Sequence, residues 1–181
     1  MKDFLLKKYT TVFKPAFIVF LLSFSAIWIF STFFRFGINW NITPSIPKGV
    51  YLSVKYKGQI LNKGDFVCFK YSSPSWAKDR KYLNEGFQLC KQIIGMSGDS
   101  LFFNKEAKTL QVGGTSIKLI EKDTRGRPLP SDTFTEGLSN IGPGMLFLKG
   151  VDDPKSLDSR YLGLINQREI VKIIIPLITY N

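Results

Sequence analysis

The stretch Phe87-Gln-Leu-Cys-Lys-Gln-Ile-Ile94 has the spacing and composition of a β-strand with one apolar face. Alternate residues of a strand share a face, so Lys91 is predicted to lie among apolar side chains. Those side chains are Phe87, Leu89 and Ile93. Burial there would lower the pKa of Lys91 and favour the neutral amine that a lysine general base needs. The alternative is an edge strand from which the Lys91 ammonium reaches water.

Similar short runs recur from Trp40 onward, separated by Gly, Pro and Asn turns. The other predicted strands are 50–56, 65–71, 100–103, 109–112, 116–120, 145–148 and 169–175. The apolar run 170–178 is too short to cross a bilayer as a helix, so it is predicted to be a terminal strand. The charged stretch 76–86 predicts a short helix or excursion. The fold class is therefore predicted to be all-β, barrel-like or sandwich-like, with one domain over 35–181.

Residues 15–34 read Pro-Ala-Phe-Ile-Val-Phe-Leu-Leu-Ser-Phe-Ser-Ala-Ile-Trp-Ile-Phe-Ser-Thr-Phe-Phe, without a charge. A helix of this length spans about 30 Å, the thickness of a hydrocarbon core. We therefore predict one N-terminal transmembrane helix. The alternatives are a cleaved signal peptide and a buried soluble helix. A cleaved signal is disfavoured because the stretch is long and is not followed by small residues.

Basic residues predict the orientation of this helix. Lys2, Lys7, Lys8 and Lys14 precede the span, and Arg35 and Lys48 are the basic residues in the twenty that follow. Because positive flanks stay in the cytoplasm, 1–14 is predicted to be a cytoplasmic tail. Residues 35–181 would be extracytoplasmic, which in a bacterium means periplasmic. The expected location is the inner (cell) membrane, as a single-pass protein in contact with the lipid bilayer.

The chain has two cysteines, Cys68 and Cys90. Outside the cytoplasm a disulfide can persist, so the two residues are candidates for a bond. Two buried free thiols are the alternative.

The composition excludes several kinds of chemistry. The chain has no histidine, which removes Ser-His-Asp and Cys-His catalysis and every histidine-containing metal site. Two cysteines cannot form a zinc site alone, so no metal or cofactor is expected. The net charge is +11, but the basic residues form no long run and accompany no nucleic-acid-binding motif. Nucleic acid is therefore not an expected partner.

The segment 41–51 reads Asn-Ile-Thr-Pro-Ser-Ile-Pro-Lys-Gly-Val-Tyr. Pro44 and Pro47 push the residues before them towards extended conformations, so Ser45 stands in a stiff stretch of backbone. Stiffness suits a nucleophile, because less ordering remains to be done during the reaction. The alternative is a proline-rich linker between anchor and domain.

Three segments together resemble the type I signal peptidase family. Segment 41–51 is similar to the nucleophile motif of its conjugative-transfer, TraF-type branch. Segment 91–99 (Lys-Gln-Ile-Ile-Gly-Met-Ser-Gly-Asp) resembles the box that supplies the catalytic lysine and ends in Gly-Asp. Segment 156–163 (Ser-Leu-Asp-Ser-Arg-Tyr-Leu-Gly) resembles a later box of the family, and it is the most specific of the three. The order of the motifs behind one N-terminal span also matches the family.

The resemblance implies a β-rich signal peptidase fold and a Ser/Lys dyad. Ser45 would be the nucleophile and Lys91 the general base. Thr43 would join the Ser45 backbone N–H in stabilising the oxyanion. Ser156 would help to orient Lys91. Asp158 and Arg160 would form a supporting ion pair.

Housekeeping signal peptidases follow the serine with Met-x-Pro-Thr, whereas Ser45 is followed by Ile46-Pro47-Lys48-Gly49. This departure favours the specialised branch. The resemblance to that branch implies a membrane-bound precursor, such as a pilin, as the substrate. The peptidase cuts this precursor, and some members of the branch also join the new ends into a ring. Hydrolysis and ring closure stay open. The alternatives are a general type I signal peptidase, an autoproteolytic repressor of the LexA type and a non-enzymatic component of a conjugation or secretion apparatus. A repressor would need a DNA-binding domain where this chain has its apolar span.

Overall fold

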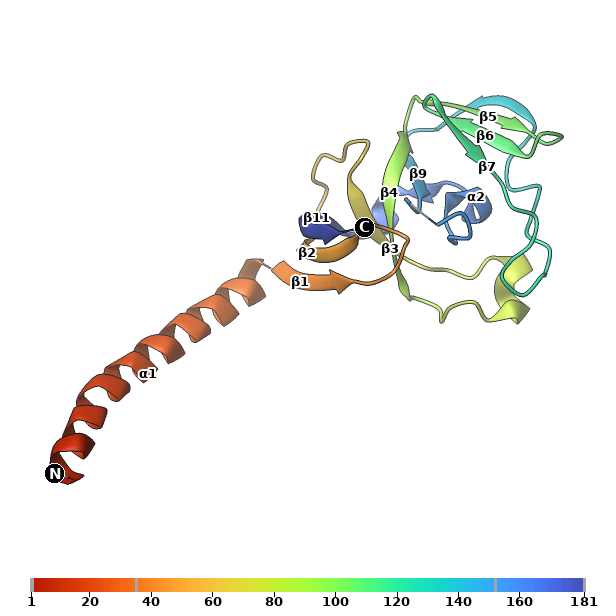
Figure 1. Cartoon of the computed structure of the whole chain (residues 1–181). Helices are drawn as coiled ribbons and strands as arrows, with labels where there is room; N and C mark the ends of the chain where they lie inside the picture. Colours follow the sequence, from red (N-terminus) through yellow and green to blue (C-terminus); the bar gives the residue numbers. More distant parts are fainter. Residues whose placement is uncertain (1, 35, 152, 181) are drawn as a thin grey trace. The chain divides into compact units, whose positions relative to one another are not determined.

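A computed structural model describes residues 2–34, 36–151 and 153–180 (Figure 1). The chain divides into two compact units, Met1–Gly37 and Ile38–Asn181. The first contains the helix α1 (Lys2–Phe34), whose side chains are described for 14–30. The other side chains of the expected tail and span lie outside the described residues. Within the described part of the chain, no helix has the length and hydropathy needed to cross a membrane.

The second unit contains two antiparallel sheets, so the predicted mostly β domain is confirmed (Figure 1). The larger sheet has the strand order β1-β2-β11-β3-β4-β9-β10. Its strands are β1 (Phe36–Asn41), β2 (Lys48–Lys55), β3 (Phe66–Lys70), β4 (Gln88–Met96), β9 (Met145–Lys149), β10 (Ile165–Asn166) and β11 (Ile170–Tyr180). The C-terminal strand therefore lies between two strands from the first half of the chain.

Pro176 is accommodated in β11 because that strand has two partners over only part of its length. β11 pairs with β2 as far as Tyr180, but with β3 only over Ile170–Ile174. Proline has no N–H to donate to a ladder, and Pro176 lies beyond the paired part of β3, at a register shift against β2. The predicted terminal strand is thus confirmed and continues to Tyr180.

The smaller sheet has the order β7-β6-β5-β8. Its strands are β5 (Ser100–Asn104), β6 (Thr109–Val112), β7 (Thr115–Lys118) and β8 (Gly137–Asn140), and the short helices are η1 (Ser75–Arg80), α2 (Ser159–Leu162) and η2 (Gln167–Glu169). The predicted excursion at 76–86 begins with η1. Each predicted strand overlaps an observed one. Three strands were not predicted. β1 is continuous with the apolar span, β8 is poor in apolar residues, and β10 is only two residues long.

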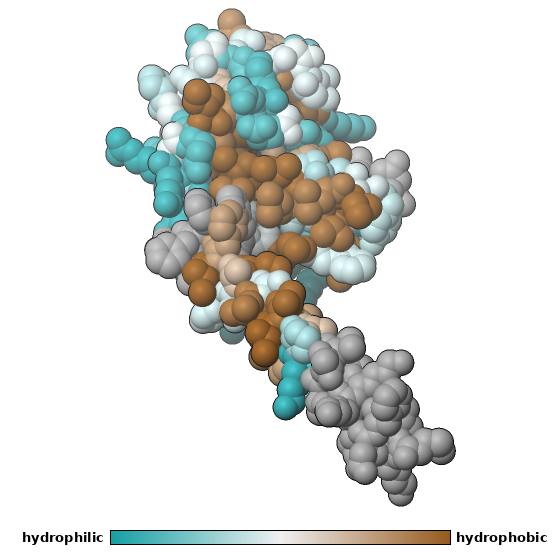
Figure 2. Space-filling view, turned by 90° about the vertical axis from the view of Figure 1, so that its left-hand side faces the viewer, coloured by the Kyte–Doolittle hydropathy of each residue, from teal (hydrophilic) through white to brown (hydrophobic). Residues whose placement is uncertain are grey.

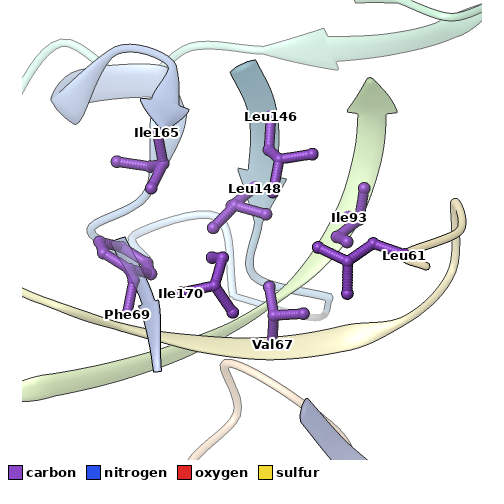
Figure 3. Close-up of a cluster of buried hydrophobic side chains, with 8 residues drawn as sticks. All are labelled: Leu61, Val67, Phe69, Ile93, Leu146, Leu148, Ile165 and Ile170. Atoms are coloured by element: carbon purple, nitrogen blue, oxygen red, sulfur yellow. The ribbon is translucent and has the colours of Figure 1, made fainter. Parts of the chain in front are cut away.

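The core of the larger sheet holds the strands that carry the candidate site. Eight buried side chains pack together in Figure 3: Leu61, Val67, Phe69, Ile93, Leu146, Leu148, Ile165 and Ile170. Ile93 belongs to β4 and lies two residues after Lys91, so both point to the same face. This core therefore fixes the strand from which Lys91 projects.

Cys68 of β3 and Cys90 of β4 are directly opposite each other in the sheet, with their Cα atoms 4.0 Å apart. The two residues form a disulfide, so the predicted bond is confirmed and free thiols are excluded for this structure. The bond joins the two strands one residue before Lys91 and therefore restrains the backbone of that lysine.

Candidate active site

Ser45 and Lys91 meet in the structure although they lie far apart in the sequence. Ser45 occupies the turn between β1 and β2, and Lys91 lies in the middle of β4. The Lys91 Nζ and the Ser45 Oγ are 2.7 Å apart and share a hydrogen bond. In the ammonium form Lys91 donates, whereas a neutral amine would accept from the Ser45 hydroxyl. The pair is therefore placed for proton transfer.

The environment of Lys91 lowers its pKa. The side chain is 2% exposed, and burial lowers the pKa to about 8 because the charged form loses hydration. The carboxylates of Asp158 and Asp153 act in the opposite direction, and the Arg160 guanidinium adds to the lowering. Desolvation outweighs the attraction of the carboxylates. The edge-strand alternative is wrong, since β4 has a neighbour on each side and Lys91 is buried.

Side chains of the motif itself hold the turn that carries Ser45. Asn41 donates from Nδ2 to the carbonyl oxygens of Thr43, Ile46 and Pro47, at 2.8, 2.9 and 3.1 Å. Tyr51 donates from its hydroxyl to the same Pro47 carbonyl at 2.5 Å. From the sequence, Asn41 was recognisable only as part of a motif. Its Asn-x-Thr spacing, typical of a side chain that caps a turn, was the signal that could have identified this role.

Thr43 lies near Ser45 but is exposed. Its hydroxyl donates to Asn41 Oδ1 at 2.7 Å, and its backbone N–H donates to the same oxygen at 3.2 Å. A role in binding an oxyanion would require the Thr43 hydroxyl to turn from Asn41 towards the substrate. The Thr43 role therefore stays a prediction.

Asp158 and Arg160 form the expected ion pair. Arg160 donates from Nε to Asp158 Oδ1 and from Nη2 to Asp158 Oδ2, both at 2.8 Å. Both side chains are almost fully buried. Arg160 also donates to the carbonyl oxygens of Asp153, Pro154 and Ser156. The pair thus fixes the loop that leads into α2.

Ser156 is buried, 3% exposed, beside Gly150. A Cβ on Gly150 would stand 2.5 Å from Ser156 Oγ, so only glycine fits opposite it. Across the part of the chain that the structure describes, Ser156 Oγ has no hydrogen-bond partner. The structure therefore brings Lys91 to Ser45 but does not join Ser156 to Lys91, and the orienting role of Ser156 stays a prediction.

A cleft of about 500 Å³ opens beside Ser45 and Lys91. Aromatic and aliphatic side chains line much of it, among them Trp40, Leu83, Phe87 and Leu89. Residues 2–34, 36–151 and 153–180 contain no group of three or more His, Cys, Asp or Glu side chains that could hold a metal ion. The arrangement suits an extended, largely apolar peptide laid across a serine and a lysine.

Comparisons with known proteins give one family. The family model described as signal peptidase, peptidase S26, matches residues 9–176. Two proteins of Escherichia coli, each named plasmid transfer protein TraF, are 31% and 30% identical to the chain over 159 residues, which is 80% of this chain and 84% of theirs. A solved signal peptidase I of Enterococcus faecalis is 22% identical, with a TM-score of 0.36, and the match covers 62% of this chain and 94% of that one.

Proposed function

Because this chain belongs to the signal peptidase family, peptidase S26, and to its TraF-type branch, we propose that it is a serine endopeptidase using a Ser45/Lys91 dyad. The observation that carries the proposal is the 2.7 Å contact between Ser45 Oγ and a buried lysine amine. In a chain without histidine, a lysine with a lowered pKa is a suitable base for a serine.

Lys91 can serve as a base at neutral pH only if part of it is uncharged. With a pKa of about 8, roughly a tenth of the molecules hold a neutral Lys91 at pH 7. At the ordinary lysine pKa of about 10.4, fewer than about one molecule in a thousand would hold a neutral lysine at pH 7. Burial therefore increases the reactive fraction by roughly two-hundredfold.

The reaction follows from this geometry. Neutral Lys91 takes the proton of Ser45 as Oγ attacks the scissile carbonyl carbon, which gives a tetrahedral oxyanion. The Ser45 backbone N–H and the Thr43 hydroxyl are the proposed donors to that oxyanion. The Lys91 ammonium then protonates the leaving amine, and an acyl-enzyme on Ser45 remains. Water or a second amine accepts the acyl group, which decides between hydrolysis and ring closure.

Asp158, Arg160 and Ser156 are proposed to position the dyad. The buried ion pair fixes the loop that leads into α2, and the Asp158 carboxylate keeps the pKa of Lys91 from falling further. Ser156 Oγ is buried without a hydrogen-bond partner among the described residues, so it is available to accept a hydrogen bond from Lys91. None of the three needs to touch the substrate.

The proposed substrate is a membrane-bound precursor used in conjugative transfer, such as a pilin, since the relatives are named for plasmid transfer. The apolar cleft beside Ser45 supports a peptide from, or next to, an apolar leader. Co-expression with candidate precursors followed by intact-mass measurement tests this. Cut and circularised products differ by the mass of one water. A precursor that stays at full mass with the active chain, for every candidate, would contradict the assignment.

We also propose that residues 15–34 anchor the chain in the bacterial inner membrane, with 1–14 cytoplasmic and 35–181 periplasmic. The large apolar side chains described between Phe17 and Phe30 are 46–68% exposed. Exposed apolar side chains also occur on β1 and on the end of β11, including Ile38, Leu177 and Ile178. Figure 2 shows apolar side chains gathered on the side of the second unit, Ile38–Asn181, that faces the viewer. A lipid bilayer would cover such surfaces.

The proposed activity has a direct chemical test. A serine-directed acylating probe should add its mass once to the full-length protein, and peptide mapping should place it on Ser45. Ser45→Ala should remove both the labelling and the cleavage. A Ser45→Ala variant that processes its precursor as well as the parent protein does would show that Ser45 is not the nucleophile.

A further inference from the structure

The cleft that holds the Ser45/Lys91 pair contains a second lysine, Lys172 of β11. In the sheet, Lys172 lies opposite Lys55 of β2 and Cys68 of β3, and residues in register point to the same face. Ile174, two residues further along β11, lines the same cleft. This face of β11 is therefore turned towards the peptide that would occupy the cleft.

The Lys172 ammonium has no partner of opposite charge in the described structure. None of the salt bridges or side-chain hydrogen bonds found among the described residues includes it. The strands β2, β3, β4 and β11 contain no aspartate or glutamate, and no described residue that lines the cleft is acidic. Lys55, directly opposite, adds a like charge. A half-buried cation in such surroundings attracts an anion from outside the protein.

The two cleft lysines differ in their surroundings. Lys91 is buried, contacts the Ser45 hydroxyl and has a lowered pKa. Lys172 is only half-buried, and the hydrogen bond to the Ser45 hydroxyl among the described residues comes from Lys91. Lys91 is therefore suited to proton transfer, whereas Lys172 is suited to binding.

We infer that the cleft selects precursors that place a carboxylate in the part of the cleft lined by β11, where Lys172 binds it. This inference rests on the proposed peptidase function and adds a feature of the substrate. The carboxylate has two possible sources, an Asp or Glu side chain of the precursor or its free C-terminus. A lysine recognises both as a single negative charge.

The test measures how well peptides protect Ser45 of the full-length protein, in detergent micelles, from the acylating probe. Synthetic peptides with an apolar half and small residues at the centre are made in pairs. One series exchanges Glu for Gln at each position in turn, and a second exchanges a free C-terminus for an amide. Because labelling reports occupancy of the cleft, the readout does not depend on turnover.

A charge-assisted contact is expected to give about tenfold stronger protection by the carboxylate member of one pair. The first series responds if the source is a side chain, and the second responds if it is the terminus. Lys172→Gln should abolish the preference, and Lys172→Glu should shift it to a peptide with Lys at the same position. Lys118→Gln on β7 removes the same charge from an exposed site outside the cleft, and it should keep the preference.

Equal protection within every pair, or a preference unchanged in Lys172→Gln, would overturn the inference and leave the Ser45 peptidase intact. The same holds if no peptide protects Ser45 at all. Failure of the probe to label Ser45 would instead remove the proposed function, and the inference with it. A merely structural role for Lys172 would lower protection by both members of a pair and could not reverse their order.

Discussion

The backbone N–H of Val151 donates to the carbonyl oxygen of Ser45 at 2.9 Å. The preceding residue, Gly150, donates its N–H to Asp158 Oδ2 at 2.8 Å. Since Arg160 fixes Asp158, these contacts connect the backbone of Ser45 to the buried ion pair. Loss of the pair should therefore affect both stability and the position of Ser45.

Asp158→Asn leaves the Arg160 guanidinium buried with a neutral partner. Breaking a buried pair in this way is expected to lower the free energy of unfolding by about 3–5 kcal/mol. Urea unfolding measures the change. Lys63→Gln is the control, because it breaks the Lys63–Asp99 pair, in which the lysine is 50% exposed, and should cost less than about 1 kcal/mol. Equal losses in the two variants would contradict the role given to the buried pair.

Asn41→Ala removes three hydrogen bonds to the carbonyl oxygens of the Ser45 turn. We expect kcat to fall by roughly tenfold or more, since a small displacement of a nucleophile is costly. Labelling of Ser45 by the acylating probe should slow in parallel. Asn104→Ala, which removes a turn contact to Ala107 in the smaller sheet, should leave both rates unchanged. A normal labelling rate in Asn41→Ala would show that Asn41 does not position Ser45.

The Cys68–Cys90 disulfide closes a loop with a sequence separation of 22. On the chain-entropy model, its removal in a Cys68→Ala/Cys90→Ala variant should lower the free energy of unfolding by about 3 kcal/mol. Urea unfolding of the variant and of the oxidised parent gives this value. Non-reducing and reducing peptide maps of the parent should differ by this one linkage. Identical maps with two free thiols would contradict the bond.

The proposed anchor predicts that the chain stays in membranes during extraction at alkaline pH. A reporter fused after Asn181 should be active only outside the cytoplasm, because the lysines before the span hold the N-terminus inside. Deleting 1–34 should release the protein from membranes. A reporter active in the cytoplasm would reverse the proposed orientation.

The strands were predictable because their side-chain periodicity is local. The proximity of Ser45 and Lys91 was not, since a proline-rich turn and a lysine on a strand each had an ordinary alternative. Only the resemblance of three segments to one family paired them. Lys91 is buried because β4 lies between β3 and β9 in the sheet. The periodicity of a sequence does not show which strands will be its neighbours.

Three features of the site could not be predicted from side-chain periodicity, because each depends on how distant or folded-back parts of the chain meet. The Asn41 contacts depend on how a turn folds back on itself, and the Val151–Ser45 contact joins distant parts of the chain. The Lys172 position depends on β11 entering the sheet between β2 and β3. A terminal strand was predicted, but its neighbours could not be, because apolar alternation specifies a face and not a partner.

The measurement that bears most directly on the Ser45/Lys91 dyad is the dependence of kcat/KM on pH. The neutral base accumulates as pH rises through the lowered pKa of Lys91, so activity should increase along an acidic limb with its midpoint at about pH 8. Lys91→Arg should abolish activity across the whole range, because an arginine stays charged. A rate that keeps rising to about pH 10.5, with the same profile in Lys91→Arg, would contradict the dyad.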